Sequence, residues 1–205
     1  MVQPLSYLKE SPSQTAGPYV HIGCTPNFAE INGVYPHDLG HRMITGEVQG
    51  QRIRITGRVI DGTGTPLRDA LVEIWQPDAA GLFNSPGETR GTADPHFTGW
   101  GRCPSDMTTG EFAFDTVKPG AVPYVDGRPQ APHVTLWIVA RGINLGLHTR
   151  MYFPDEAEAN AADPILSRIE HQVRVATLIG EAKGEGHYHF DIRLQGHNET
   201  VFFDI

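Results

Sequence analysis

Residues 51–59 read QRIRITGRV, and their side chains alternate between apolar and polar types. A period of two places the isoleucines and Val59 on one face of a strand and the arginines on the other. The turn-forming sequence DGTGTP follows at 61–66, and an apolar strand follows at 70–75. We therefore expect these two strands to form a β-hairpin.

The rest of the chain is also dominated by short strands. Further strands are expected at residues 111–114, 133–140, 149–153, 187–194 and 200–203. Helix is limited to a piece over 156–162, capped by Asp155, and one capped by Asp163 that runs to about residue 170. Strands and helices do not alternate, so a parallel doubly wound sheet is excluded. We expect an all-β protein: a β-sandwich of mostly antiparallel strands, with short helical excursions and an extended N-terminal arm.

The first fifty residues have a different character. Segment 11–19 is polar and rich in turn formers, which fits an arm lying over its own surface or a partner's, and equally a loosely ordered terminus. We expect residues 1–50 to form an arm that packs on a partner chain and 51–205 to form the sandwich domain. Residues 77–104 are rich in Gly and Pro, and so long a loop is usually functional or part of an interface.

Composition excludes several classes of function. The 205 residues include 24 acidic and 16 basic side chains, a net charge of −8, so no basic stripe is available for nucleic acid. No apolar run approaches the roughly 20 residues of a membrane span, and the N-terminus does not resemble a secretory signal. Cys24 and Cys103 form no CxxC motif, so we expect reduced thiols and a cytoplasmic protein.

Motifs for nucleotide binding (GxxxxGK[ST], GxGxxG) and for a serine nucleophile (GxSxG) are absent from the sequence. Histidine is the remaining lead, with ten copies. His187 and His189 have metal-ligand spacing, which would suit an autonomous metalloenzyme. However, alternation places Tyr188 and Phe190 in the core and both histidines on the solvated face, which is the preferred interpretation. Trp75 and Trp137 lie in apolar runs, so we expect core residues there in place of sugar-stacking platforms.

His133 begins the most apolar strand of the chain. Histidines at i and i+2 can share a metal ion, but the second position holds Thr135, and a catalytic metal needs about three protein ligands. On its own, His133 is expected to lie at the core edge with a hydrogen bond to the backbone. Arg141 ends the same strand, beside Gly142, where a guanidinium can pair with a carboxylate of this chain, a partner or a ligand. The intrachain pair is the default expectation.

Seven segments, in order along nearly the whole chain, resemble one family. They are TAGPYVHIG (15–23), EIWQ (73–76), TVKPG (116–120), APH (131–133), ARGIN (140–144), LHTR (147–150) and ETVFFD (199–204). The family is the protocatechuate 3,4-dioxygenases, which are intradiol ring-cleaving enzymes, and the segments resemble its α chains. The resemblance implies a β-sandwich in each of two homologous chains, α and β, and a hetero-oligomer of repeated αβ units.

The resemblance also implies a ferric ion, Fe(III), that the β chain binds with two tyrosines and two histidines. The histidine positions are matched here by His133 and Thr135, and one tyrosine position by Val122. The other tyrosine should precede Asp94, but residues 36–123 contain no tyrosine. We therefore expect a degenerate site in this chain and a metal held only by the partner.

In the family, the α chain contributes residues to the active site of the β chain, and the matching positions are Thr15, Tyr19 and Arg141. The substrate, protocatechuate, carries a ring carboxylate, so we expect Arg141 to orient it and the other two to line the pocket. The reaction uses O2 and gives 3-carboxy-cis,cis-muconate, a step of aromatic degradation in the β-ketoadipate pathway. The alternative class is a non-catalytic β-sandwich that acts as a binding or adaptor module.

Overall fold

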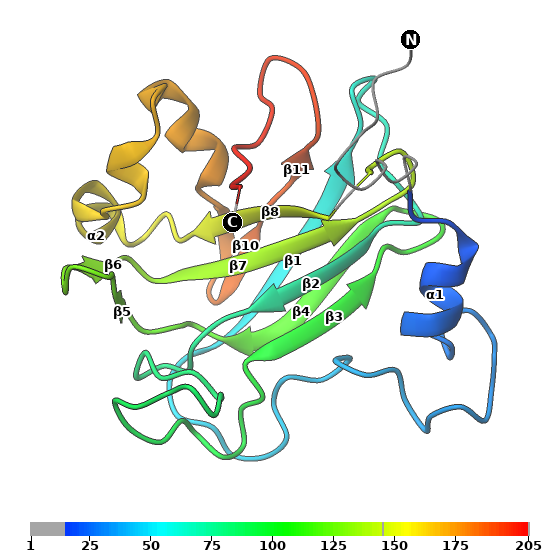
Figure 1. The fold of residues 1–205 in the computed structure, drawn as a ribbon, viewed down its shortest axis with the longest axis horizontal. Coiled ribbons are helices and arrows are strands. Elements are labelled where there is room, and N and C mark those ends of the chain that lie inside the picture. Colours follow the sequence, from blue (N-terminus) through cyan, green and yellow to red (C-terminus); the bar gives the residue numbers. More distant parts are fainter. Residues whose placement is uncertain (1–14, 145, 205) are drawn as a thin grey trace, which may run out of the picture.

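The computed structural model describes residues 15–144 and 146–204, and two main sheets pack face to face in it (Figure 1). The first sheet contains β1 (Arg52–Ile60), β4 (Glu111–Val117), β9 (Glu181–Gly184), β10 (His187–His189) and β11 (Ile192–Arg193). The second has the order β3 (Trp100–Pro104), β2 (Leu71–Trp75), β7 (His133–Val139), β8 (Leu147–Tyr152). The two-residue strands β5 (Val122–Pro123) and β6 (Pro129–Gln130) pair separately.

Pairing within the sheets is antiparallel except where β1 runs parallel to β10 and β11. One apolar core fills the space between the sheets, to which β1 contributes Ile53 and Ile55 and β7 contributes Val134, Leu136 and Ile138. These side chains follow the period of two in the sequence, since every second residue of a strand points to the same face. The expected β-sandwich of mostly antiparallel strands is confirmed.

The predicted hairpin is wrong. β1 and β2 lie in different sheets, and the turn at 61–66 carries the chain from one sheet to the other. β2 pairs instead with β3 and β7. The alternation and the turn residues indicate a reversal of direction, but they do not specify the hydrogen-bonding partner of either strand.

Other strand boundaries also differ from expectation. The 77–104 stretch ends in β3, whose sequence WGRCP contains Gly and Pro and lacks a strand pattern. The expected strand over 187–194 divides into β10 and β11. No strand forms over 200–203, where an isolated bridge joins His148 to Phe203.

Two tryptophans are wrongly assigned to the core by the sequence. Trp75 is 37% exposed and stacks on Phe83, with ring centroids 5.8 Å apart. Trp137 is half-buried, on the face of β7 opposite to its core residues. Alternation within each strand indicates this outer face, because Glu73 shares the face of Trp75 and Thr135 shares the face of Trp137.

Within the described residues, four short helical segments connect or flank the strands. They are α1 (Pro18–Cys24), α2 (Ala157–Ala162) and the 3-10 helices η1 (Leu166–Arg168) and η2 (Gln172–Leu178). α2 confirms the helix expected at 156–162, but Asp155 does not cap it, because this carboxylate binds Lys118 at 2.8 Å and the Tyr188 hydroxyl at 3.0 Å. No helix among the described residues is long and apolar enough to cross a membrane.

Asp163 does act as a cap, with its Oδ1 accepting the N–H groups of Ile165 and Leu166, but the helix that follows is the single turn η1. The arm also departs from an extended conformation, because α1 forms within it. Pro18 fixes a helical φ at the first position, and none of the seven residues of α1 is buried, so no amphipathic pattern marks it. Further along the arm, Met43 is buried in the core.

Candidate functional site

The positions that the resemblance matches to metal ligands lie at the start of β7, which carries His133 and Thr135, and on β5, which carries Val122. His133 is only 5% exposed, and its Nδ1 donates a hydrogen bond to the carbonyl oxygen of Ala131 at 2.7 Å. Burial, helped by the charge of Arg150, lowers the pKa of His133 to about 4. The imidazole is therefore neutral at pH 7, and the expected core-edge histidine bonded to the backbone is confirmed.

Arg150 brings a positive charge close to His133 and Thr135. It lies on β8 directly opposite Thr135, so the two side chains share a face of the sheet. Its Nη1 donates to Gln130 Oε1 at 2.8 Å, and its guanidinium lies 5.7 Å from the ring centroid of Phe203. A fixed cation at this position disfavours a second cation close by.

These residues do not fit a ferric ion. Val122 offers no donor atom and the hydroxyl of Thr135 is neutral, so Nε2 of His133 would be the single imidazole ligand, because Nδ1 bonds the backbone. Within 15–144 and 146–204, no three His, Cys, Asp or Glu side chains are grouped so that they could hold a metal.

A second cluster joins the arm to the end of β7. The N–H of Gly142 donates to Thr15 Oγ1 at 2.8 Å, and Arg141 Nη2 lies 2.9 Å from Asp69 Oδ2. On the other side, His21 Nε2 donates to the backbone oxygen of Asp69 at 3.0 Å. The default expectation of an intrachain carboxylate for Arg141 is confirmed, and Thr15 lies next to it.

A largely apolar cavity of about 810 Å³ opens beside this cluster, and its lining includes Ala16, Pro18, His21, Asp69, Met107 and Arg141. The Arg141 side chain is 76% exposed. Tyr19 is 84% exposed on α1 and does not belong to the lining. The structure thus brings Thr15 and Arg141 together and leaves Tyr19 on the surface of the helix beside them.

The two sites lie far apart on one face of the sheet. β7 runs from β5, β6 and α2 on one side of the molecule to α1 on the other (Figure 1). Arg141 follows His133 by eight positions, which at about 3.3 Å per residue is roughly 26 Å. The Arg141 cluster therefore cannot act on a ligand held next to His133 of the same chain.

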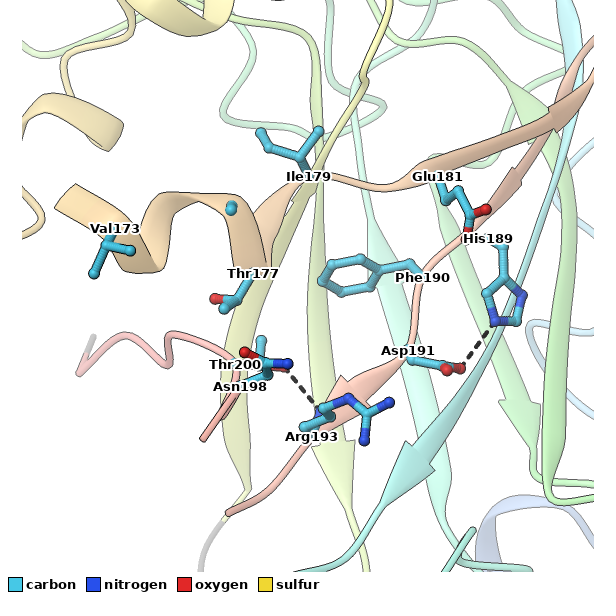
Figure 2. Close-up of a pocket in the computed structure, with 11 residues that line it drawn as sticks. Val173, Thr177, Ile179, Glu181, His189, Phe190, Asp191, Arg193, Asn198 and Thr200 are labelled. Carbon is cyan, nitrogen blue, oxygen red and sulfur yellow. Dashed lines mark hydrogen bonds and ion pairs between the residues drawn. The ribbon is translucent and has the colours of Figure 1, made fainter. Parts of the chain in front are cut away.

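His187 and His189, the two histidines with metal-ligand spacing, lie on β10 of the first sheet. His189 lines a cavity of about 370 Å³, in which its Nε2 is 3.0 Å from Asp191 Oδ1 (Figure 2). Thr56 Oγ1 is 3.0 Å from His187 Nε2 and 3.1 Å from His189 Nδ1. Both nitrogens of His189 are thus engaged, so this pair is a hydrogen-bonded surface network and gives no support to an autonomous metalloenzyme.

The fold places the chain in a class. A family model described as "Dioxygenase" matches residues 24–196. An intradiol ring-cleavage dioxygenase from Tetranychus urticae superposes with a TM-score of 0.55 at 18% identity, covering 78% of this chain and 89% of that one. The 3-chlorocatechol 1,2-dioxygenase from Rhodococcus opacus 1CP gives 0.56 at 19% identity, covering 78% and 68%. The chain belongs to the intradiol dioxygenase family.

Sequence relatives are more specific. The chain is 44% identical to the protocatechuate 3,4-dioxygenase alpha chain of Pseudomonas putida, covering 98% of this chain and 100% of that protein. The alpha chain of Burkholderia cepacia is 36% identical with the same coverage. The beta chain of Burkholderia cepacia is 38% identical, but the match covers 84% of this chain and 77% of that one. The resemblance stated from the motifs is confirmed, with the alpha chains matched over their full length.

Sequence reasoning missed Asp69, the ionic partner of Arg141, and gave Arg150 no role. Asp69 stands two residues before β2, whose Leu71 pairs with Val139. This register, once known, places Asp69 beside Arg141, since both lie two residues beyond that pair. No local signal in the sequence indicates it.

Proposed function

We propose that this chain is the α, non-iron subunit of a protocatechuate 3,4-dioxygenase. With a homologous β chain it would cleave protocatechuate with O2 to give 3-carboxy-cis,cis-muconate. The observation that carries this proposal is the loss of ligands: Val122 and Thr135 stand at positions that the resemblance matches to metal ligands, and the guanidinium of Arg150 lies opposite Thr135. A chain that keeps the family fold and lacks a metal site needs a partner for catalysis.

The ferric ion would be bound by the β chain, and there it would prepare the catechol ring for reaction with O2. The residues of this chain would bind and orient the substrate. A guanidinium can form a bidentate pair with a carboxylate, so Arg141 would attract the ring carboxylate and fix its direction. Thr15 would hold the turn that carries Arg141, and the exposed ring of Tyr19 would line the pocket.

Two features support action on a partner. The Arg141 side chain is largely exposed, and it lies roughly 26 Å from His133 of its own chain. The arm also carries exposed apolar side chains, namely Tyr19, Ile22, Ile31, Val34, Tyr35 and Leu39. Exposed apolar groups that lie together mark interaction surfaces. We therefore propose that the arm (residues 1–50) packs on the β chain in a hetero-oligomer of repeated αβ units.

We also propose a cytoplasmic location, which is consistent with the unpaired thiols of Cys24 and Cys103.

The test is purification of the chain alone and together with its β chain, followed by measurement of iron, visible absorption and ring cleavage. We expect the chain alone to be colourless, free of iron and inactive, and the complex to be coloured by tyrosinate-to-iron charge transfer and active. Stoichiometric iron in the chain alone would refute the proposal. Full activity of the β chain without this chain would favour the adaptor class instead.

A further inference from the structure

Asp69 contacts both Arg141 and the helix α1 of the arm. Its carboxylate pairs with Arg141, while its backbone oxygen accepts the hydrogen bond of His21 from α1. The next residue after Arg141, Gly142, is bound in turn by Thr15. The arm therefore contacts both sides of the ion pair. His21 binds the backbone oxygen of Asp69, and Thr15 binds the N–H of Gly142, the neighbour of Arg141.

The carboxylate of Asp69 is better placed than Arg141 to act as a fixed anchor. Its side chain is 30% exposed, whereas that of Arg141 is 76% exposed. Asp69 directly precedes Ala70, which is buried, and Leu71, which starts β2. A free arginine samples many rotamers, and each must be given up when a ligand binds. An anchored carboxylate restricts that sampling before the ligand arrives.

We propose that Asp69 is a positioning residue that directs the Arg141 guanidinium toward the carboxylate of the substrate. The proposal rests on the proposed function, since it assumes that Arg141 meets that carboxylate. Asp69 acts only through Arg141 and does not contact the substrate. Its effect is therefore confined to substrates that carry a carboxylate and disappears when Arg141 is absent.

The test uses the αβ complex and compares protocatechuate with catechol, which lacks the ring carboxylate. Asp69→Asn keeps the shape of the side chain and removes its charge, and the backbone link to His21 is unaffected. We expect KM for protocatechuate to rise about 3- to 10-fold, with kcat nearly constant and both constants for catechol unchanged. Asp69→Glu, which keeps the carboxylate, is expected to restore part of the loss.

The matched control is Asp115→Asn, which neutralises the carboxylate of an exposed ion pair with Arg54 on the other sheet (2.8 Å) and should leave both substrates unaffected. The double variant Asp69→Asn/Arg141→Ala should equal Arg141→Ala alone. Equal losses for both substrates, additive effects in the double variant, or a lower KM for protocatechuate would overturn the proposal. If Arg141→Ala raises KM and Asp69→Asn does not, only the role of Asp69 fails. If neither has an effect, the role proposed for Arg141 fails as well.

Discussion

His133, which the family resemblance matches to a metal ligand, is a buried residue bonded to the backbone in this chain. Its imidazole is buried and neutral, and its pKa is lowered to about 4. In the unfolded chain the pKa of histidine is about 6.5. Between these values the unfolded state binds more protons, so acidification from pH 6.5 to 4 removes stability that is fully present above pH 6.5.

We predict that this group alone lowers the free energy of unfolding by up to about 1.4 kcal/mol per pH unit in that window. Urea denaturation at pH 7, 6 and 5 measures it. The variant His133→Gln, which cannot titrate, should show a shallower loss over the same range, while other titrating groups contribute equally to both proteins. Parallel profiles for the two proteins would contradict the prediction.

Thr135 stands at the position that the resemblance matches to a second histidine ligand, and we predict that a histidine there does not create a metal site. A histidine at 135 would stand opposite Arg150, and Val122 would still offer no donor. We predict that Thr135→His binds no more Fe(III) than the unmodified chain, as measured by metal analysis after reconstitution. A visible charge-transfer band or one equivalent of iron in the variant would show that the pocket is more adaptable than its charges indicate.

At the scale of the element, alternate residues of β7 face the core and the outer side of the sheet. Leu136 is fully buried between the sheets, whereas Val139 is half-buried on the outer face. We predict that Leu136→Ala lowers the free energy of unfolding by about 2–5 kcal/mol, because it removes buried groups and leaves a cavity. Val139→Ala is the control on the same strand and should cost clearly less in the same urea titration. Equal costs would mean that the outer face is as tightly packed as the core.

The contact between the arm and the β7–β8 turn is a second element with a measurable role. Thr15→Val keeps the side-chain shape and removes the acceptor of the Gly142 N–H. One hydrogen bond contributes about 0.5–1.5 kcal/mol, so we predict that hydrogen exchange at Gly142 becomes about 2- to 10-fold faster. Amides within β7 should keep their rates. Thr45→Val, which removes an arm hydrogen bond to His96, is the control and should not change the rate at Gly142.

At the scale of the whole molecule, the exposed apolar side chains of the arm predict that the chain self-associates when its partner is absent. Tyr19 and Val34 are among the more exposed of them, and a partner that covers such groups stabilises the folded chain by mass action. We predict that the chain alone self-associates in size-exclusion chromatography, and that it elutes as one defined complex when it is produced with the β chain. A monodisperse monomer at micromolar concentration would argue that the arm needs no cover.

The sequence by itself determined the β-sandwich class and the family, and it predicts the loss of the metal ligands. Alternation is a local property of each strand, and a missing ligand is visible as a residue identity at Val122 and Thr135. Only the tertiary structure decided that β1 and β2 belong to different sheets, that the charge of Arg150 acts on His133, and that Asp69 pairs with Arg141. These facts depend on which strands pair and in what register, and pairing is set by long-range packing that no local pattern encodes.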